Sequence, residues 1–134
     1  MPYQRIEHTA DIRLKVWGKT LEELFSDAMQ AMSNIIKEVE VESSNIKRNI
    51  TLKAGDATTL LISFLSEVLL LSHTNKEVYN KVIFVEFSET ELKAKIEGVK
   101  VNQFDEDIKA VTFHEADVVK NKEEEWETNL VFDI

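Results

Sequence analysis

Residues 8–25, HTADIRLKVWGKTLEELF, contain the two periodicities that decide the fold. Residues 12–17 predict a strand with one buried face, because Ile12, Leu14 and Val16 alternate with Arg13 and Lys15. Gly18 closes this strand, and Thr20 follows as a helix-capping residue. Because Glu23 stands three residues after Thr20, the spacing predicts a capping box and the beginning of a helix. A strand that leads directly into a helix is therefore the first unit of the predicted fold.

The helix that begins at Thr20 is predicted to extend to about residue 37. Its apolar residues recur at helical spacing, and they are Leu21, Leu24, Phe25, Ala28, Met29, Met32, Ile35 and Ile36. Residues 46–53, IKRNITLK, predict a second strand, and Asp56 is placed to cap a second helix over residues 57–73. This second helix has a broad apolar face with one mixed stripe, formed by Ser63, Ser66, Glu67 and Leu70.

The second half of the chain is predicted to be all β. Residues 81–87, KVIFVEF, and 91–97, ELKAKIE, predict a hairpin with a short turn between them. Two further strands are predicted over residues 108–119 and 126–133. About six strands and two helices predict an α+β fold, a single mostly antiparallel sheet with both helices packed on one face. A chain of 134 residues without a linker rich in glycine, serine or proline predicts one domain over residues 1–134.

Composition restricts the class of protein. The chain has no cysteine, which excludes disulfides, thiolate metal sites and cysteine nucleophiles. Its formal net charge is −9, so we expect no direct binding of nucleic acid, whose phosphates would be repelled. With only three glycines in the chain, a phosphate-binding loop is not expected either. We find no apolar run long enough for a membrane span and no secretory signal, so we expect a cytoplasmic protein.

Two polar features interrupt this pattern of strands. Asp11 stands just before the first strand, although aspartate is a poor strand former. The last predicted strand runs into Asp133 and Ile134, where chain ends usually fray. If it ends beside the beginning of the first strand, the carboxylates of Asp11 and Asp133 and the carboxylate or carbonyl of Ile134 would converge. Such oxygen anions would repel one another unless a hard cation, calcium or magnesium, lay between them.

Each of these residues also has a purely structural interpretation, and the residue pattern leaves the choice open. Asp11 could accept backbone hydrogen bonds in a turn or bulge, and the terminal oxygens could simply be solvated. His8 and His114 stand near strand ends, where they could donate structural hydrogen bonds. His73 stands near the end of the second helix, where an imidazolium is favoured by the helix dipole.

Four segments resemble, in the same order, the signature segments of the archease family. They are HTADIRLKVWGKTLEELFSDA at residues 8–28, GDATTLLISFLSEVLLL at 55–71, IKAVTFH at 108–114 and VFDI at 131–134. The resemblance implies a small cytoplasmic protein that is not an enzyme and that acts on an RtcB-type RNA ligase in tRNA splicing and RNA repair. It further implies that this accessory factor promotes guanylylation of the ligase and sustains its multiple turnover.

The resemblance also implies a divalent metal ion, calcium, as cofactor, with Asp11, Asp133 and Ile134 as its ligands. Four further residues are candidates for supporting the site or contacting the partner, namely His8, Glu67, Lys109 and His114. The sequence departs from the family pattern at residues 64–68, which read FLSEV where the family has a Trp-Leu-Asn-Glu-Leu run. It departs again where Phe113, His114 and Glu115 replace a Tyr-His-Gly or Tyr-His-Asp run. Both departures leave the implied metal ligands intact.

Two other functions remain as alternatives. A metal-dependent hydrolase would use Asp11, Asp133 and a bound water, and it would turn over phosphoester substrates slowly. A chaperone-like binding module would associate with other RNA-modifying proteins, such as an RNA methyltransferase. A ligation assay with RNA in excess over purified ligase separates these functions, because only a ligase activator converts single turnover into multiple turnover.

Overall fold

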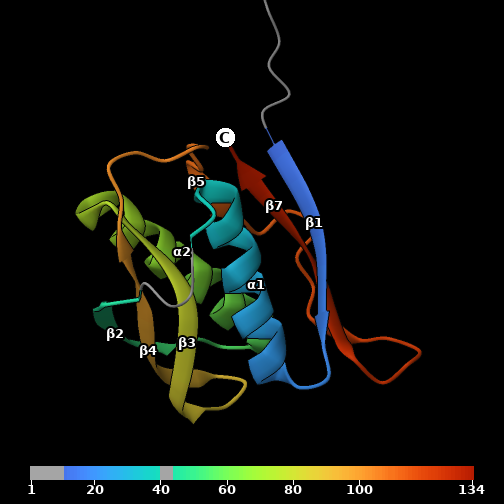
Figure 1. Ribbon diagram of the computed structural model, residues 1–134. Coiled ribbons are helices and arrows are strands. Elements are labelled where there is room, and N and C mark those ends of the chain that lie inside the picture. Colours follow the sequence, from blue (N-terminus) through green and yellow to red (C-terminus); the bar gives the residue numbers. More distant parts are fainter. Residues whose placement is uncertain (1–10, 40–43) are drawn as a thin grey trace, which may run out of the picture.

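The computed structural model describes residues 11–39 and 44–134 (Figure 1). Their elements follow the order β1 (Asp11–Gly18), α1 (Leu21–Ile36), β2 (Ile46–Lys53), α2 (Ala57–Asn75), β3 (Glu77–Phe87), β4 (Glu91–Lys100), β5 (Ala110–Thr112), β6 (Val119–Lys120) and β7 (Trp126–Asp133). These strands form two sheets in which every pairing is antiparallel. One sheet has the order β1-β7-β5, with β6 also paired to β7, and the other has the order β2-β4-β3.

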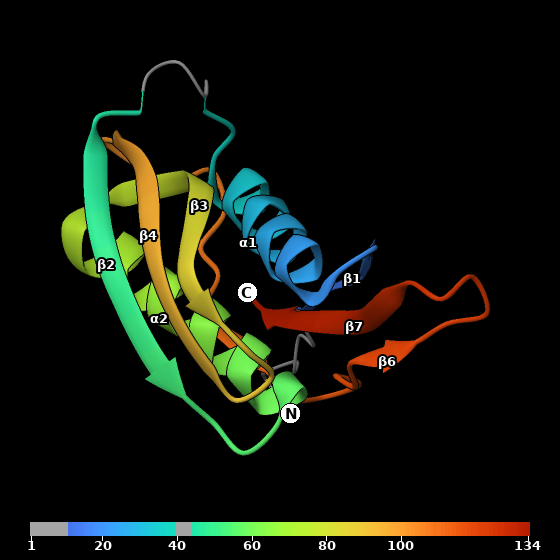
Figure 2. The same ribbon diagram turned by 90° about the horizontal axis from the view of Figure 1, so that it is seen from below.

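The predicted α+β class and antiparallel pairing are confirmed, but two sheets replace the single predicted sheet. Each helix contacts both sheets, because α1 packs on β1 and β3 while α2 packs on β2, β3 and β5 (Figure 2). The buried side chains of both helices and both sheets form one hydrophobic core. A helix with an apolar face as broad as that of α2 needs cover from more than one direction, which a second sheet supplies.

Helix α2 is long and apolar enough to cross a membrane, judged by length and composition alone. A core helix of a globular protein has the same composition, because it is covered on most of its surface. Eight side chains of α2 are buried in this structure, and they are Leu60, Leu61, Ile62, Phe64, Leu65, Val68, Leu69 and Ser72. The burial of this helix between the two sheets accounts for its apolar sequence.

Both helices begin at the predicted capping residues. The Thr20 hydroxyl accepts a hydrogen bond from the backbone N–H of Glu23 at 3.1 Å. The Glu23 carboxylate reaches back to the backbone N–H of Lys19 at 2.9 Å, one residue before the position expected for a capping box. Asp56 accepts from the backbone N–H of Thr59 at 2.7 Å, and this bond lowers the pKa of the Asp56 carboxyl below its ordinary value. Local capping signals therefore set the beginnings of α1 and α2.

Strand β3 begins at Glu77, earlier than the predicted residue 81. Residues 77–80 were not predicted to be part of this strand, and they include a buried charged residue, Glu77. The Glu77 side chain is only 2% exposed. Arg48 donates from Nε and Nη2 to its two oxygens at 3.0 and 2.8 Å, and the Tyr79 hydroxyl donates to it at 2.6 Å. The guanidinium lowers the pKa of the Glu77 carboxyl, while burial raises the pKa of the Tyr79 hydroxyl. A polar residue can thus belong to a buried strand because its charge is paired.

The continuous strand predicted over residues 108–119 is wrong. Only Ala110–Thr112 and Val119–Lys120 are strands, and both pair with β7. Between them the Thr112 hydroxyl accepts from the backbone N–H of His114 at 3.2 Å, and the N–H of Ala116 donates to the carbonyl of Phe113 at 3.0 Å. A turn in this place is expected from a threonine side chain that bonds to nearby backbone, and it divides the predicted strand in two.

Candidate metal centre

Strands β1 and β7 lie side by side (Figure 1), and their register places Asp11 directly opposite Asp133. The next pair along the strands, Ile12 and Phe132, packs into the hydrophobic core. Because successive side chains of a strand point to opposite faces, the two aspartates lie together on the outer face of the sheet. Residues directly opposite in antiparallel strands have Cβ atoms about 5 Å apart. The predicted meeting of the beginning of the first strand and the end of the last is therefore present in the fold.

The end of β7 is held from both sides. On one side it pairs with β1, and on the other Ala110 of β5 is the register partner of Asp133. The backbone N–H of Lys109 donates to the carbonyl of Asp133 at 2.7 Å. Ile134 is partly buried and packs against the hydrophobic core. These contacts fix the main chain around Asp133, so a ligand set built on it would be pre-organised.

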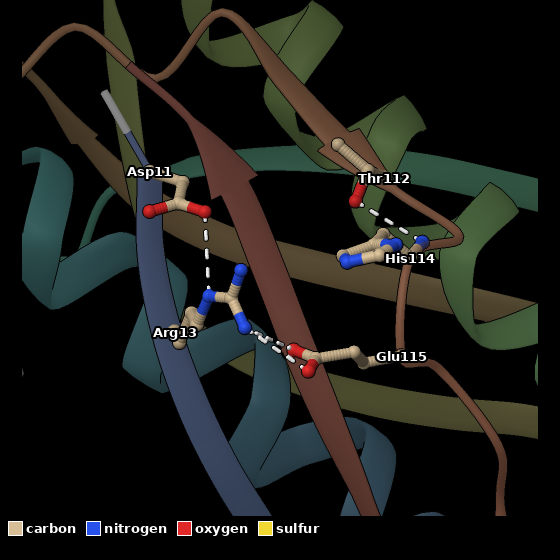
Figure 3. A network of polar contacts seen from close by, with 5 residues as sticks. All are labelled: Asp11, Arg13, Thr112, His114 and Glu115. Carbon is tan, nitrogen blue, oxygen red and sulfur yellow. Dashed lines mark hydrogen bonds and ion pairs between the residues drawn. The ribbon is translucent and has the colours of Figure 1, made fainter. Parts of the chain in front are cut away.

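Two like charges in directly opposite positions destabilise a sheet. One cation of the described residues compensates Asp11, because Arg13 lies two residues further along β1 on the same face (Figure 3). Its Nε lies 3.3 Å from Asp11 Oδ2, and its Nη1 lies 3.0 Å from each carboxylate oxygen of Glu115. Among the residues that the structure describes, Asp133 forms no ion pair. The pair of aspartates thus has an excess of negative charge on a fixed backbone.

The donor atoms here suit a hard divalent cation. No group of three or more His, Asp or Glu side chains able to hold a metal occurs in the described parts of the chain. Asp11 and Asp133 would supply two carboxylates, and the main-chain oxygens of Ile134 follow immediately after the second. Calcium accepts carboxylate, carbonyl and water oxygens in irregular geometry, whereas magnesium requires a nearly ideal octahedron. The three predicted ligands are therefore compatible with a cation, and their metal-binding role stays a prediction.

The four candidates for support or partner contact are dispersed. His8 lies outside the described residues. His114 is exposed in the turn after β5, on the opposite side of β7 from Asp11 (Figure 3). Lys109 contributes its backbone N–H to the end of β7, as described above, and Glu67 is half-buried on α2. The contact and support roles of these residues stay predictions.

Two residues of the mixed stripe of α2 line a hollow on the surface of the protein. Ser66 and Leu70 line a shallow hollow between α2 and β5 together with His73 and Lys109. Leu70 is 57% exposed there, which leaves one large apolar side chain on the surface. His73 Nε2 lies 3.6 Å from Asp107 Oδ1, so its position at the end of α2 includes a potential ion pair. This hollow adjoins the strand that supports Asp133.

Two residues of the site, Arg13 and Glu115, were not singled out from the sequence. Arg13 could have been found, because alternation along β1 places it on the same face as Asp11. Glu115 could not, because it is 102 positions from Arg13 and lies in an irregular turn. Its backbone has a positive φ of 65°, which is uncommon for a residue other than glycine.

Two antiparallel sheets around two helices define a class of α+β proteins that other solved structures share. A crystal structure of an archease, a possible chaperone, from Thermotoga maritima aligns over 100% of this chain and 98% of its own, with a TM-score of 0.74 and 20% identity. The solution structure of Methanobacterium thermoautotrophicum protein 1598 aligns over 96% of each chain, with a TM-score of 0.76 and 23% identity.

The chain belongs to the archease family, whose model matches residues 3–134. The protein archease of Methanosarcina mazei is 35% identical over 140 residues, which cover 98% of this chain and 95% of that protein. The protein archease of Methanopyrus kandleri is 31% identical over 147 residues and covers both chains completely. The family resemblance stated from the sequence is thereby confirmed.

Proposed function

We propose that this chain is a non-catalytic accessory factor that activates an RtcB-type RNA ligase, with a divalent cation, calcium, as its cofactor. Family membership supports an archease role, and the finer assignment to ligase activation extends the resemblance noted in the sequence. The observation that carries the proposal is the register pair of Asp11 and Asp133 on a well-held sheet end. The factor would act in the cytoplasm by promoting guanylylation of the ligase and its multiple turnover.

In this proposal Asp11, Asp133 and the main-chain oxygens of Ile134 hold the cation. The bound cation would supply positive charge that removes the repulsion between the two carboxylates. The chain itself would keep this end of the sheet rigid, through the pairing of β7 with β1 and β5. The same end of the sheet leads into the turn that exposes Phe113 and His114, which would contact the partner. Charge compensation and partner contact are thus assigned to neighbouring parts of one surface.

An accessory factor changes the output of its partner by binding one state of it more tightly than another. A tenfold shift in population requires a difference in binding free energy of about 1.4 kcal/mol, which a small interface can supply. The net charge of −9 favours a protein partner over direct contact with RNA phosphates. The proposed partner is therefore the ligase protein and not its RNA substrate.

The test is a ligation assay with RNA in excess over purified ligase. The wild-type chain should raise the amount of joined RNA above one equivalent of ligase, and Asp11→Asn and Asp133→Asn should remove this stimulation while the proteins remain folded. Glu86→Gln is the matched control, since this exposed carboxylate lies on β3 of the other sheet, where it pairs with Lys93 at 3.7 Å. Full stimulation by both folded aspartate variants would refute the site, and no stimulation by wild type would refute the function.

A related archease favours a second candidate function. The related Thermotoga maritima archease is described as a possible chaperone. We therefore also propose, as the alternative, a chaperone-like binding module for RNA-modifying proteins. Light scattering of a purified RNA methyltransferase held at its aggregation temperature tests this, and suppression near equimolar ratio is the expected result. Unchanged aggregation at a tenfold excess of this chain would exclude it. No feature of the described residues favours the metal-dependent hydrolase, which we do not propose.

A further inference from the structure

Arg13 is shared between two carboxylates that differ in what else they can bind. Asp11 belongs to the candidate metal centre, whereas Glu115 lies in the turn beyond β5 (Figure 3). The contact with Asp11 is a single one of 3.3 Å from Nε, and the contact with Glu115 joins Nη1 to both carboxylate oxygens at 3.0 Å. The Arg13 side chain is 54% exposed, so neither ion pair is strong. Of the two partners, Asp11 is held less closely.

Glu115 is held towards Arg13 by its own turn. The turn is closed by the hydrogen bond from Ala116 N–H to the Phe113 carbonyl, and Glu115 occupies its left-handed position with φ 65°. A residue with a side chain is disfavoured in this region, so the position is maintained by its surroundings. None of these backbone contacts involves Asp11. Glu115 can therefore keep the guanidinium in place when Asp11 is no longer available to it.

We propose that Arg13 is the resident counter-ion of Asp11 that sets the affinity of this site for a divalent cation, and that Glu115 retains the guanidinium when a cation binds. The inference rests on the proposed metal centre and goes beyond it, because it assigns an affinity-setting residue and a partner that the proposed ligand set does not contain. Arg13 is a positioning residue in this scheme and touches no cation. A cation that binds Asp11 uses the same carboxylate charge as the Nε contact, so the two compete for one carboxylate.

Competition predicts opposite effects for the two substitutions. Arg13→Gln removes the resident positive charge and should tighten calcium binding about fivefold, the factor expected for loss of one nearby charge in a solvated site. Glu115→Gln removes the alternative partner of the guanidinium, so Arg13 would rest wholly on Asp11 and calcium binding should weaken by about threefold. The matched control is Lys15→Gln, since Lys15 lies on the same face of β1 and pairs with Glu127 at 3.4 Å. It should leave the affinity nearly unchanged.

A double-mutant cycle separates the competition from simple long-range electrostatics. Calcium alone is titrated calorimetrically into wild type, Arg13→Gln, Glu115→Gln and the double variant, each verified as folded by circular dichroism. If Glu115 acts by holding Arg13, Glu115→Gln weakens binding in the wild type and has no effect in the Arg13→Gln background. Equal weakening in both backgrounds, or calcium binding that Arg13→Gln does not tighten, would overturn the inference while leaving the metal centre intact.

A spectroscopic readout follows the guanidinium directly. Addition of calcium should shift the Nε–Hε resonance of Arg13 in ¹H–¹⁵N spectra, whereas that of Arg48, which is paired to the buried Glu77, should stay in place. A titration in which the Arg13 resonance does not move while calorimetry detects binding would also refute the exchange. Absence of calcium binding to the wild type would instead refute the metal centre itself, and the inference with it, so the two failures are distinguishable.

Discussion

The two sheets differ in the signs of the charged residues that lie opposite each other on neighbouring strands. In the β2-β4-β3 sheet, every pair of charged residues in directly opposite register has opposite sign, and these pairs are Lys47 with Glu97, Lys53 with Glu91, Glu77 with Lys100, Lys81 with Glu97 and Glu86 with Lys93. In the β1-β7-β5 sheet, Asp11 stands opposite Asp133. Opposite charges across strands stabilise a sheet and like charges destabilise it. We call the β1-β7-β5 sheet the first sheet and the β2-β4-β3 sheet the second sheet. The contrast indicates that the pair of like charges lowers the stability of the first sheet, and that a bound cation would restore it.

The largest expected effect comes from the β2-β4-β3 sheet, at a glycine that faces the main chain of the next strand. Gly98 of β4 lies opposite Tyr79 of β3, and a Cβ at this position would overlap the carbonyl oxygen of Val78. Gly98→Ala should therefore lower the free energy of unfolding by about 3 kcal/mol, at the upper end of overpacking costs. Urea denaturation measures this loss. The control is Gly55→Ala, whose Cβ would meet open space, and an equal loss in that variant would contradict the explanation.

The next effect removes the buried charge pair of the second sheet. Glu77→Gln should lower the free energy of unfolding by about 2 kcal/mol at neutral pH, because Arg48 and Tyr79 lose a charged partner. The pKa of Glu77 is lower in the folded chain than in the unfolded one. Its contribution is therefore complete above the unfolded pKa and is lost as the pH falls through the folded pKa.

The pH dependence sharpens that prediction. Wild type and Glu77→Gln should converge in stability as the pH is lowered from 7 towards and below the ordinary carboxyl pKa, because protonation removes the charge that the substitution has already removed. Chemical denaturation at a series of pH values measures the difference. A difference between the two proteins that stays constant over this range would show that the charge of Glu77 contributes nothing.

A smaller effect tests the like-charge pair of the first sheet. Without added cation, Asp133→Asn should raise the free energy of unfolding by about 0.5 kcal/mol, because the repulsion with Asp11 disappears. With calcium in excess, the wild type should gain thermal stability and the variant should not. Differential scanning calorimetry with calcium or with a chelator measures both. A variant less stable than the wild type under chelation would contradict the account of a strained pair.

The smallest effect is expected when a pair of like charges is introduced into the second sheet, β2-β4-β3. Lys53→Glu places a carboxylate opposite Glu91, which imitates the arrangement of Asp11 and Asp133 on the exposed face of the second sheet. The free energy of unfolding should fall by about 0.3 kcal/mol at low salt, and less at high salt, because both side chains are solvated. Lys53→Gln controls for loss of the existing pair, whose atoms are 4.0 Å apart. An unchanged stability would show that register alone does not impose a cost.

The sequence predicted most elements because alternation and capping are local signals. β2 was predicted with its observed bounds, and the helices begin where Thr20 and Asp56 cap them. Alternation says which face of a strand is buried but not which element covers it, so the division into two sheets could not be predicted. In the same way, the pairing of Asp11 with Asp133 could be anticipated from two strand ends, whereas Arg13 and Glu115 are 102 positions apart and no local pattern predicts their contact.

The strand order has a consequence for how the protein is made. The β2-β4-β3 sheet is built from consecutive parts of the chain and can close while later residues are still being synthesised. Strand β1, in contrast, pairs only with β7 among the described strands. The backbone hydrogen bonds of β1 to another strand can therefore form only after almost the whole chain has been synthesised. Asp11 gains its neighbour only at that last step. A cation at this position would bind only after β7 has paired with β1. A chain that lacks Asp133 and Ile134 would lack two of the three proposed ligands and would not bind it.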